Sequence, residues 1–198
     1  MKKALAIFDF DGTISNNDSL KDYLRFCEGK WIFFLKYYLL FIFDLIKCLH
    51  DKKLFLKLKT KRINFFFRDK NVDVLSSKAN KYYKYRFKDI LKSSAIQRLE
   101  WHRLMDHEIV ILSASLDIIL KKWCKENNFH LITNTLQIKD NKYTGNFTEE
   151  DCNGRQKVVM LLKNFNLNGY DETYGYGDTE GDLDFLELVD KKYYKYFK

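Results

Sequence analysis

The chain has 198 residues and a formal net charge of +8, and 46% of its residues are hydrophobic. That length fits one sizeable core, or one core with an inserted subdomain, and the apolar content excludes a disordered chain. The charge is uneven: residues 14–92 hold 19 Lys and Arg against 8 Asp and Glu (+11), and the remainder holds 16 against 19 (−3). The basic segment suits an anionic ligand, a membrane surface or nucleic acid, or is a solvated lysine-rich helical surface.

In chain order the predicted elements alternate between strands and helices. This alternation predicts an α/β fold, a Rossmann-like parallel sheet with helices on both faces. The elements are a strand at 4–8, a helical segment at 19–92, a helix at 94–106, a strand at 108–115, a helix at 116–128, a strand at 130–134, a hairpin at 136–147 with its turn near 140–142, a helix at 154–166, a strand at 173–178 and a helix at 181–189.

The apolar stretch 31–46 has three interpretations. It is shorter than the roughly 20 residues that span a bilayer, and Lys36 and Asp44 interrupt it. It is therefore a buried helix of the inserted subdomain, a helix on a membrane surface, or a true span. The membrane-surface interpretation draws on the neighbouring lysines Lys52, Lys53, Lys57 and Lys59.

The cysteines are scattered, with no CxxC pair and no histidine pair at metal spacing near them. We interpret them as reduced thiols of a cytosolic protein. The sequence shows no secretory signal, because its first apolar run is short and ends in aspartates, so a cytoplasmic location is expected. The four cysteines are Cys27, Cys48, Cys124 and Cys152.

Polar side chains gather where three predicted strands end. Ligands of parallel α/β sheets bind at the carboxyl ends of the strands, so these side chains are expected to converge. Two carboxylates two residues apart in an extended chain also point the same way, and their repulsion calls for a cation. The residues are Asp9 and Asp11 after the first strand, Ser113 and Ser115 in the second, and Asp178 and Asp182 after the last.

These residue types can support phosphoryl transfer, which needs positioning and positive charge around the phosphate oxygens. Asp9, Asp11 and Asp178 can share Mg²⁺, a cation that prefers oxygen ligands. With the cation bound, Asp9 can act as nucleophile, and Asp11 can serve as general acid and then general base.

Three further residues fit the same chemistry, although each alone has a simpler explanation. Ser113 can donate to a phosphate oxygen, Lys157 can neutralise another, and Gly12 allows a tight turn after the carboxylates. Singly, a serine after a strand is often a helix cap and a helix lysine is often solvated. Their order along one α/β chain favours the functional interpretation.

Four ordered motifs resemble those of the haloacid dehalogenase superfamily of phosphohydrolases. They are DFDGT (9–13), ILSAS (111–115), the lysine of NGRQKVV (153–159) and YGDTEGD (176–182). The insertion between the first two resembles the helical cap of the phosphoserine-phosphatase-like branch. The resemblance implies an α/β core formed by 1–13 and 93–198, and an α-helical cap at about 14–92.

The resemblance also implies a role for each matching residue. Asp9 would form an aspartyl-phosphate, and Asp11 would be the general acid and base with its backbone carbonyl on Mg²⁺. Asp178 would bind the metal and Asp182 would orient the metal's water shell. Ser113 and Lys157 would hold the phosphate.

Asp18 matches the position at which phosphoserine phosphatases carry an acidic residue near the substrate's amino group. A carboxylate there favours a cationic amine, but Asp18 is equally well placed to cap a helix that starts at Ser19. Two features depart from the branch: Gly181 stands where many members have asparagine, and the cap carries no recognisable carboxylate-binding motif. Arg62, Arg68 and Arg86 are the candidates to meet a substrate carboxylate.

The sequence thus predicts a Mg²⁺-dependent phosphatase that acts on small phosphorylated metabolites. The favoured substrates are amino-alcohol phosphates such as phosphoserine, phosphoethanolamine or serinol phosphate. One alternative is a lipid-phosphate phosphatase of the phosphatidylglycerophosphate type, with peripheral membrane contact through the cap. The remote alternative is a non-catalytic module that binds through the basic, aromatic cap; nucleic acid is not an expected partner.

Overall fold

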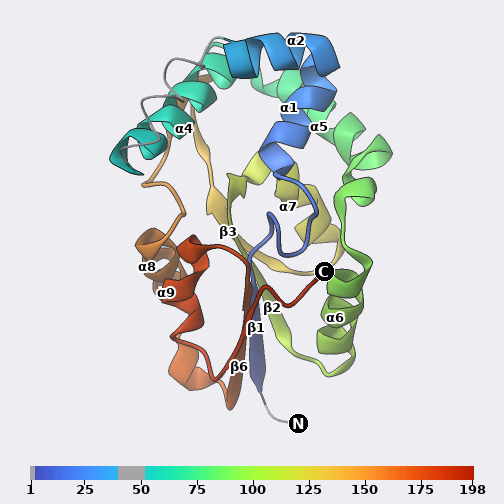
Figure 1. The fold of residues 1–198 in the computed structure, drawn as a ribbon, viewed down its shortest axis with the longest axis vertical. Coiled ribbons are helices and arrows are strands. Elements are labelled where there is room, and N and C mark those ends of the chain that lie inside the picture. The colour runs from blue at the N-terminus through green and yellow to red at the C-terminus, as the bar shows by residue number, and fades with distance from the viewer. Residues whose placement is uncertain (1–2, 40–51) are drawn as a thin grey trace.

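A computed structural model describes residues 3–39 and 52–198 of the chain. Within them, one parallel sheet has the strand order β3-β2-β1-β6-β7, which confirms the predicted α/β fold (Figure 1). Because β1 is central, its carboxyl end lies between those of β2 and β6. The strands are β1 (Ala4–Phe8), β2 (Glu108–Leu116), β3 (His130–Asn134), β6 (Glu172–Gly177) and β7 (Lys191–Tyr194).

Both faces of the sheet are buried, because alternate residues of a strand point to opposite sides. On β1, Phe8 belongs to one hydrophobic cluster and Ile7 to the other. Leu120 of α7 joins the first cluster, and Leu161 of α8 joins the second. The covering helices are α6 (Ser93–Leu104) and α7 (Asp117–Glu126) on one face, and α8 (Arg155–Asn164) and α9 (Leu183–Leu186) on the other.

A second group of helices lies beyond the carboxyl ends of the strands (Figure 1). This group corresponds to the described part of the segment predicted as helical at 19–92. Residues 40–46 of the apolar stretch lie outside the described residues. The elements are α1 (Ser19–Glu28), α2 (Lys30–Phe34), a π-helical turn (Leu35–Leu39), α4 (Lys52–Phe67), α5 (Val72–Tyr85) and a 3₁₀ turn (Phe87–Ile90).

The hairpin of β4 (Leu136–Lys139) and β5 (Lys142–Phe147) packs against this helical group instead of joining the sheet. Its turn is at Asp140 and Asn141, where it was predicted, and both residues have positive φ. The Asp69 amide donates to the carbonyl of Tyr143 at 2.9 Å, just after α4 ends. The helical insertion therefore has a β-hairpin as a neighbour, and its boundaries at 14 and 92 stay a prediction.

Two elements differ from expectation. β7 was not predicted: it is short and lysine-rich, and the paired β6 holds it at the edge of the sheet. The apolar stretch is helical over 31–39 and, over 31–38, only partly buried, which differs from the first of its three interpretations, a buried helix. Across residues 3–39 and 52–198, no helix has the length and apolar character to cross a membrane.

The cysteines of the described residues form no disulfide. Burial raises the pKa of Cys124 and of Cys152 to about 12, so both stay protonated thiols at neutral pH. Cys27 is a free thiol, and Cys48 lies outside the described residues.

Buried aromatic rings pack against one another just before the carboxyl ends of β1 and β6. Phe8 and Tyr176 stack with centroids 4.2 Å apart on neighbouring strands, directly before the polar residues that follow. The Tyr176 hydroxyl accepts from Arg98 Nε at 2.6 Å and lies 3.0 Å from Nε2 of His102. His102 Nδ1 in turn lies 2.8 Å from Nδ1 of His107. This network of polar contacts holds the hydroxyl end of the Tyr176 side chain in place.

Candidate active site

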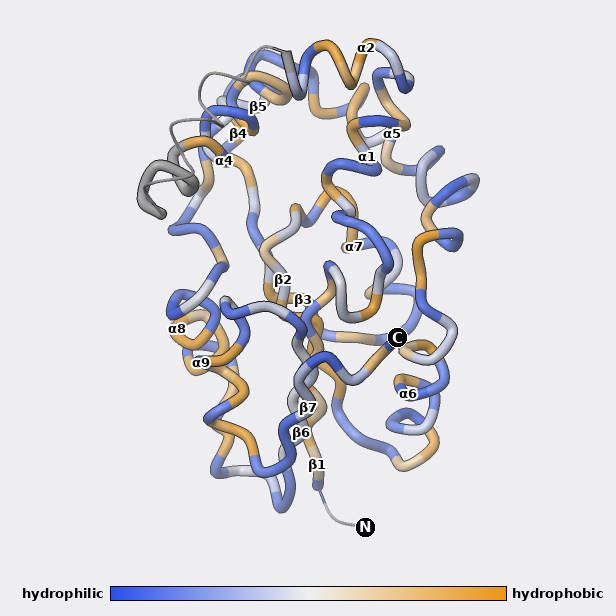
Figure 2. The backbone as a smooth tube through the Cα atoms, in the orientation of Figure 1, coloured by the Kyte–Doolittle hydropathy of each residue, from blue (hydrophilic) through white to orange (hydrophobic). Residues whose placement is uncertain are grey.

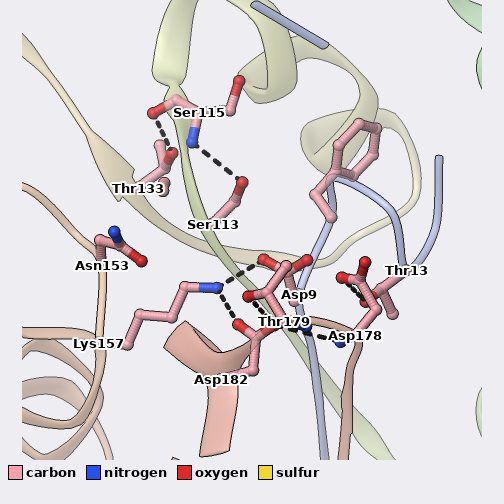
Figure 3. A network of polar contacts seen from close by, with 12 residues as sticks. Asp9, Thr13, Ser113, Ser115, Thr133, Asn153, Lys157, Asp178, Thr179 and Asp182 are labelled. Atoms are coloured by element: carbon pink, nitrogen blue, oxygen red, sulfur yellow. Dashed lines mark hydrogen bonds and ion pairs between the residues drawn. The ribbon is translucent and has the colours of Figure 1, made fainter. Parts of the chain in front are cut away.

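The predicted residues of β1, β2 and β6 do converge at one edge of the sheet (Figure 3). Phe8 is in register with Ile111 of β2 and with Tyr176 of β6. One residue beyond Phe8, the Asp9 amide donates to the Tyr176 carbonyl at 2.9 Å. Asp9 is one residue beyond this pairing and Ser113 and Asp178 are two residues beyond it, so strand register brings the three close together at the same edge.

Lys157 organises the charges at this edge. Its Nζ lies 2.6 Å from Oδ1 of Asp9 and 2.6 Å from Oδ1 of Asp182, and its side chain is 3% exposed (Figure 3). Burial alone would lower the pKa of Lys157, but the two carboxylates raise it, so the lysine is charged. Lys157 thus contacts the proposed nucleophile directly, which the sequence could not show.

Asp182 holds the residues that follow β6 in place through hydrogen bonds. Its Oδ2 accepts from the amides of Asp178 and Thr179, at 3.2 and 2.9 Å, and from the Thr179 hydroxyl at 2.8 Å. Burial would raise the pKa of Asp182, but Lys157 and Thr179 hold it below its usual range. Both oxygens of Asp182 are thus bonded within the chain, and its predicted role of orienting the metal's water shell stays a prediction.

Asp178 packs tightly against Gly12. Its Oδ1 accepts from the Thr13 hydroxyl at 3.0 Å. A Cβ at Gly12 would lie 2.2 Å from Oδ2 of Asp178, and Gly12 has a φ of +84°. Glycine is therefore needed at position 12 both for its conformation and for the space of the carboxylate.

The acidic residues fit a divalent cation. Among the described residues, Asp9, Asp178 and Asp182 offer carboxylate oxygens that lie within 4.8 Å of one another. Burial raises the pKa of Asp9 to about 6; Lys157 opposes this, and the carboxylates of Asp182 and Asp178 add to it. Three carboxylates beside one lysine leave negative charge that a cation would neutralise.

Contrary to the prediction from their spacing in an extended chain, the side chains of Asp9 and Asp11 do not point the same way: Asp11 faces away from this cluster, toward the helical insertion. Its Oδ1 accepts from the Ser19 amide at 2.7 Å, at the start of α1. Burial and the carboxylates of Asp18 and Asp9 raise the pKa of Asp11 to about 7, against the bonds from Ser19. The expected contact of its backbone carbonyl with a metal stays a prediction.

Ser113 is fully buried in β2, where its hydroxyl accepts from the Ser115 amide at 3.1 Å. Ser115 lies 2.7 Å, oxygen to oxygen, from Ser19, and its carbonyl accepts from Thr133 at 2.9 Å. These bonds tie the end of β2 to β3 and to the first helix of the insertion. The position of Ser113 is consequently fixed from both sides.

Sequence reasoning missed a polar bridge between α4 and the core. Lys59 Nζ donates to the Ala114 carbonyl at 3.0 Å and to Asp151 Oδ1 at 2.5 Å. Asn134 Nδ2 donates to the same two oxygens, at 2.8 and 2.6 Å. One of the three interpretations of the apolar stretch placed Lys59 beside a membrane-surface helix, yet it reaches inward beside Ser113. No sequence signal separates it from its neighbours, because its partners are far away in the chain.

Asp18 caps α1, as one of its two interpretations required. Its side chain accepts from the Lys21 amide at 2.9 Å, and its other oxygen lies 2.9 Å from Lys21 Nζ. Two cations lie over the ring of Tyr37: Lys21 Nζ is 5.9 Å from the ring centroid, and the Arg62 guanidinium is 4.4 Å from the same centroid. The role of Asp18 toward a substrate amine stays a prediction.

The three candidate arginines have different surroundings. Arg86 makes two bonds to the Asp22 carboxylate, both 3.1 Å, and is committed to the helical insertion. Arg68 is exposed, and its Nε lies 3.9 Å from Oδ2 of the neighbouring Asp69. Arg62 donates to the Tyr37 hydroxyl at 3.2 Å, on the side of Lys21 and Asp18. Arg62 is thus the arginine grouped with residues close to the strand ends.

Comparison with known proteins agrees with this architecture. The chain is 28% identical over 199 residues to protein CicA of Caulobacter vibrioides, covering 98% of this chain and 86% of that protein. A Bordetella pertussis protein of unknown function superposes with a TM-score of 0.77 at 17% identity, over 97% of this chain and 89% of that one. A substrate-bound phosphoserine phosphatase superposes with a TM-score of 0.68 at 20% identity, over 98% and 86% of the two chains.

The two structures share the fold at low identity, whereas a family model tests the sequence itself. The model of the haloacid dehalogenase-like hydrolases matches residues 6–187, which include all four motifs and the residues gathered at the strand ends. The chain therefore belongs to the haloacid dehalogenase-like hydrolase family.

Proposed function

We propose that this chain is a Mg²⁺-dependent phosphatase that hydrolyses a small phosphate monoester through a phosphorylated Asp9. The observation that carries the proposal is the buried bridge of Lys157 between Asp9 and Asp182, beside Asp178. A lysine in this position holds the nucleophile's Oδ1 and supplies positive charge where phosphate oxygens would gather. Family membership supports a hydrolytic reaction.

The residues can be assigned to two chemical steps. In the first, Oδ2 of Asp9 attacks phosphorus, the ester P–O bond breaks, and Asp11 gives its proton to the leaving alcohol. In the second, Asp11 takes a proton from water, whose oxygen attacks phosphorus, and the bond from phosphorus to Asp9 breaks to release phosphate. Ser113 and Lys157 would hold phosphate oxygens in both steps.

Asp9 and Asp178 are the side chains suited to hold Mg²⁺, because Lys157 and Thr179 already occupy the oxygens of Asp182. When bound, Mg²⁺ would neutralise phosphate charge and allow Asp9 to stay ionised as the phosphate approaches. Full dependence on Mg²⁺, with activity lost in chelator and restored by added cation, is the expected behaviour.

The favoured substrates remain amino-alcohol phosphates, supported by Asp18 and by the fold shared with the phosphoserine phosphatase. The residue after Asp18, Ser19, donates its amide to Oδ1 of Asp11 at 2.7 Å, so a substrate amine beside Asp18 would be close to the proposed general acid. Such an amine would have to displace Lys21 from the carboxylate. Arg62 is the candidate for a carboxylate on the same substrate.

A panel assay of released phosphate, with and without Mg²⁺, tests the proposal. Phosphoserine, phosphoethanolamine and serinol phosphate should be faster than glycerol phosphate, which lacks the amine. Equal rates on glycerol phosphate would remove the amine argument. The Asp9→Asn variant should lose at least about 1,000-fold in kcat; hydrolysis at the wild-type rate would show that Asp9 is not the nucleophile.

A lipid-phosphate phosphatase is the second candidate, favoured by exposed aromatic side chains on α2 beside basic residues. Phosphatidylglycerophosphate in mixed micelles, added to the same panel, separates the two. A higher kcat/KM for the lipid than for every soluble ester would replace the first candidate by the second.

A further inference from the structure

The outer surface of α2 and the turn that follows it is unusually apolar for an exposed surface. We define the α2 face as Trp31, Ile32, Phe34, Leu35 and Tyr38. Trp31 is 80% exposed, and the other four are between 41% and 55% exposed. Figure 2 shows hydrophobic residues along α2 at the end of the molecule opposite the amino terminus of β1. A contiguous exposed patch of this kind marks an interaction site.

The local structure explains why these side chains point outward. Gly29, with a φ of 82°, ends α1 and precedes α2, so the chain changes direction sharply between the two helices. Phe33 and Tyr37, one helical turn apart, are each 6% exposed and pack inward against Phe66 of α4. These two residues form the buried stripe of α2 and the turn after it, and the apolar residues of the α2 face point away from it.

Basic residues flank the α2 face. Arg25 and Lys30 are both exposed, and together with Trp31, Phe34 and Tyr38 they line a surface hollow of about 410 Å³. Lys30 Nζ lies 5.9 Å from the Trp31 ring centroid. Apolar rings next to positive charges match a lipid interface, where rings sit at headgroup level and basic side chains meet anionic headgroups.

We propose that the α2 face docks on the surface of an anionic lipid bilayer. Trp31 and Phe34 enter the interface, and Arg25 and Lys30 contact the negatively charged headgroups. A second copy of the chain fits less well, because a symmetric contact through this face would bring the same two cations of each copy together. The proposal concerns binding alone and does not depend on the proposed reaction, whose residues lie at the strand ends.

Binding to vesicles in the absence of substrate tests the proposal. The probes are vesicles of equal parts phosphatidylglycerol and phosphatidylcholine, and vesicles of phosphatidylcholine alone. We expect co-sedimentation with the anionic vesicles, weaker in high salt and with neutral vesicles. The emission of Trp31 should shift to the blue on binding, whereas Trp123 is already buried.

Variants connect the binding to this face. Trp31→Ala combined with Phe34→Ala should weaken binding at least tenfold, and replacing Arg25 and Lys30 by Gln should weaken it about fivefold per residue. Leu104→Ala is the matched control, because Leu104 is 76% exposed but lies on α6 beside the sheet. It should bind like the wild type.

Three results would overturn the proposal. The protein could stay in the supernatant with anionic vesicles, or bind equally well in the aromatic double variant. It could also form concentration-dependent dimers that this variant abolishes, which would make a second copy the occupant. Phosphate release from a water-soluble ester should be unchanged in the double variant, so failure of membrane binding and failure of the proposed reaction are observed separately.

Discussion

The carboxyl edge of the sheet and the α2 face of the helical insertion invert the usual distribution of residues. At the edge, Lys157, Asp9 and Asp182 carry charge in a site that water hardly reaches, with side chains between 1% and 6% exposed. On the α2 face, Trp31 and its apolar neighbours are exposed. Charge inside is tolerated when it is paired and hydrogen-bonded, and apolar surface outside when something else covers it.

This contrast has consequences for stability. The buried charges depend on partners within the chain, so removing one should damage the fold as well as the chemistry. The exposed rings contribute little to the fold, so removing them should affect binding alone. The following predictions are arranged from the largest expected effect to the smallest.

Lys157→Met should cost about 3–5 kcal/mol of unfolding free energy, because it leaves Asp9 and Asp182 buried without their cation. Phosphatase activity should fall with it. Urea denaturation measures the loss, with two controls. Lys163→Met removes an exposed lysine from the same helix, and Trp31→Ala removes a larger side chain from the α2 face; each should change stability by less than about 0.5 kcal/mol. A similar loss in Trp31→Ala would break the comparison.

Gly12→Ala should cost about 1–3 kcal/mol and most of the activity, because a Cβ at position 12 collides with the Asp178 carboxylate at a positive φ. Gly169→Ala is the control, since a Cβ there meets nothing within 4 Å. Thermal unfolding and phosphate release measure both effects. Normal activity in Gly12→Ala would mean that Asp178 is not held where the structure has it.

Lys59→Met should destabilise the protein by about 1–2 kcal/mol and raise KM more than it lowers kcat. The reason is that Lys59 connects α4 to the Ala114 carbonyl, next to Ser113, through charge-assisted bonds. Lys59→Arg should bring KM part of the way back to the wild-type value. The exposed Lys81→Met is the control and should change neither KM nor stability. An unaltered KM in Lys59→Met would show that this bridge does not affect substrate binding.

His102 should make the fold sensitive to mild acid. Burial, aided by Arg98 and His107, lowers the pKa of His102 from 6.5 to about 3, so the unfolded chain takes up a proton that the folded chain refuses. The contribution of neutral His102 to the unfolding free energy is complete above about pH 6.5. It falls as the pH drops, so that the protein loses roughly 1 kcal/mol of stability at pH 5.5. Unfolding free energies of the wild type and His102→Gln at pH 7.5 and 5.5 measure it. Equal losses in both proteins would contradict the assignment.

Much of the fold and of the candidate site could be predicted from sequence, because both depend on local patterns. Alternation of strands and helices indicated the parallel sheet, and the apolar run before Asp9 indicated a buried strand. Polar residues after three strands indicated where they would meet, since parallel strands end at one edge. The order of the four motifs pointed to the correct family, because each motif is a short local pattern that can be found in the sequence.

Contacts between distant segments could not be predicted. Lys157 and Asp9 are 148 residues apart, and Lys59 and Asp151 are 92 apart. In sequence, Lys59 is one of many lysines on a basic helix, and its direction depends on how α4 packs on the core. The short strand β7 likewise exists because β6 offers it an edge.

By itself, the sequence determined the chemistry available at the strand ends, because residue type and strand period place Asp9, Ser113 and Asp178 together. It also determined that residues 31–39 are apolar. The tertiary structure decided which charges pair, that Asp18 caps α1, and that Trp31 faces outward while Phe33 is buried. Those outcomes depend on packing between elements, and no local pattern encodes which side of a largely apolar helix will find a partner.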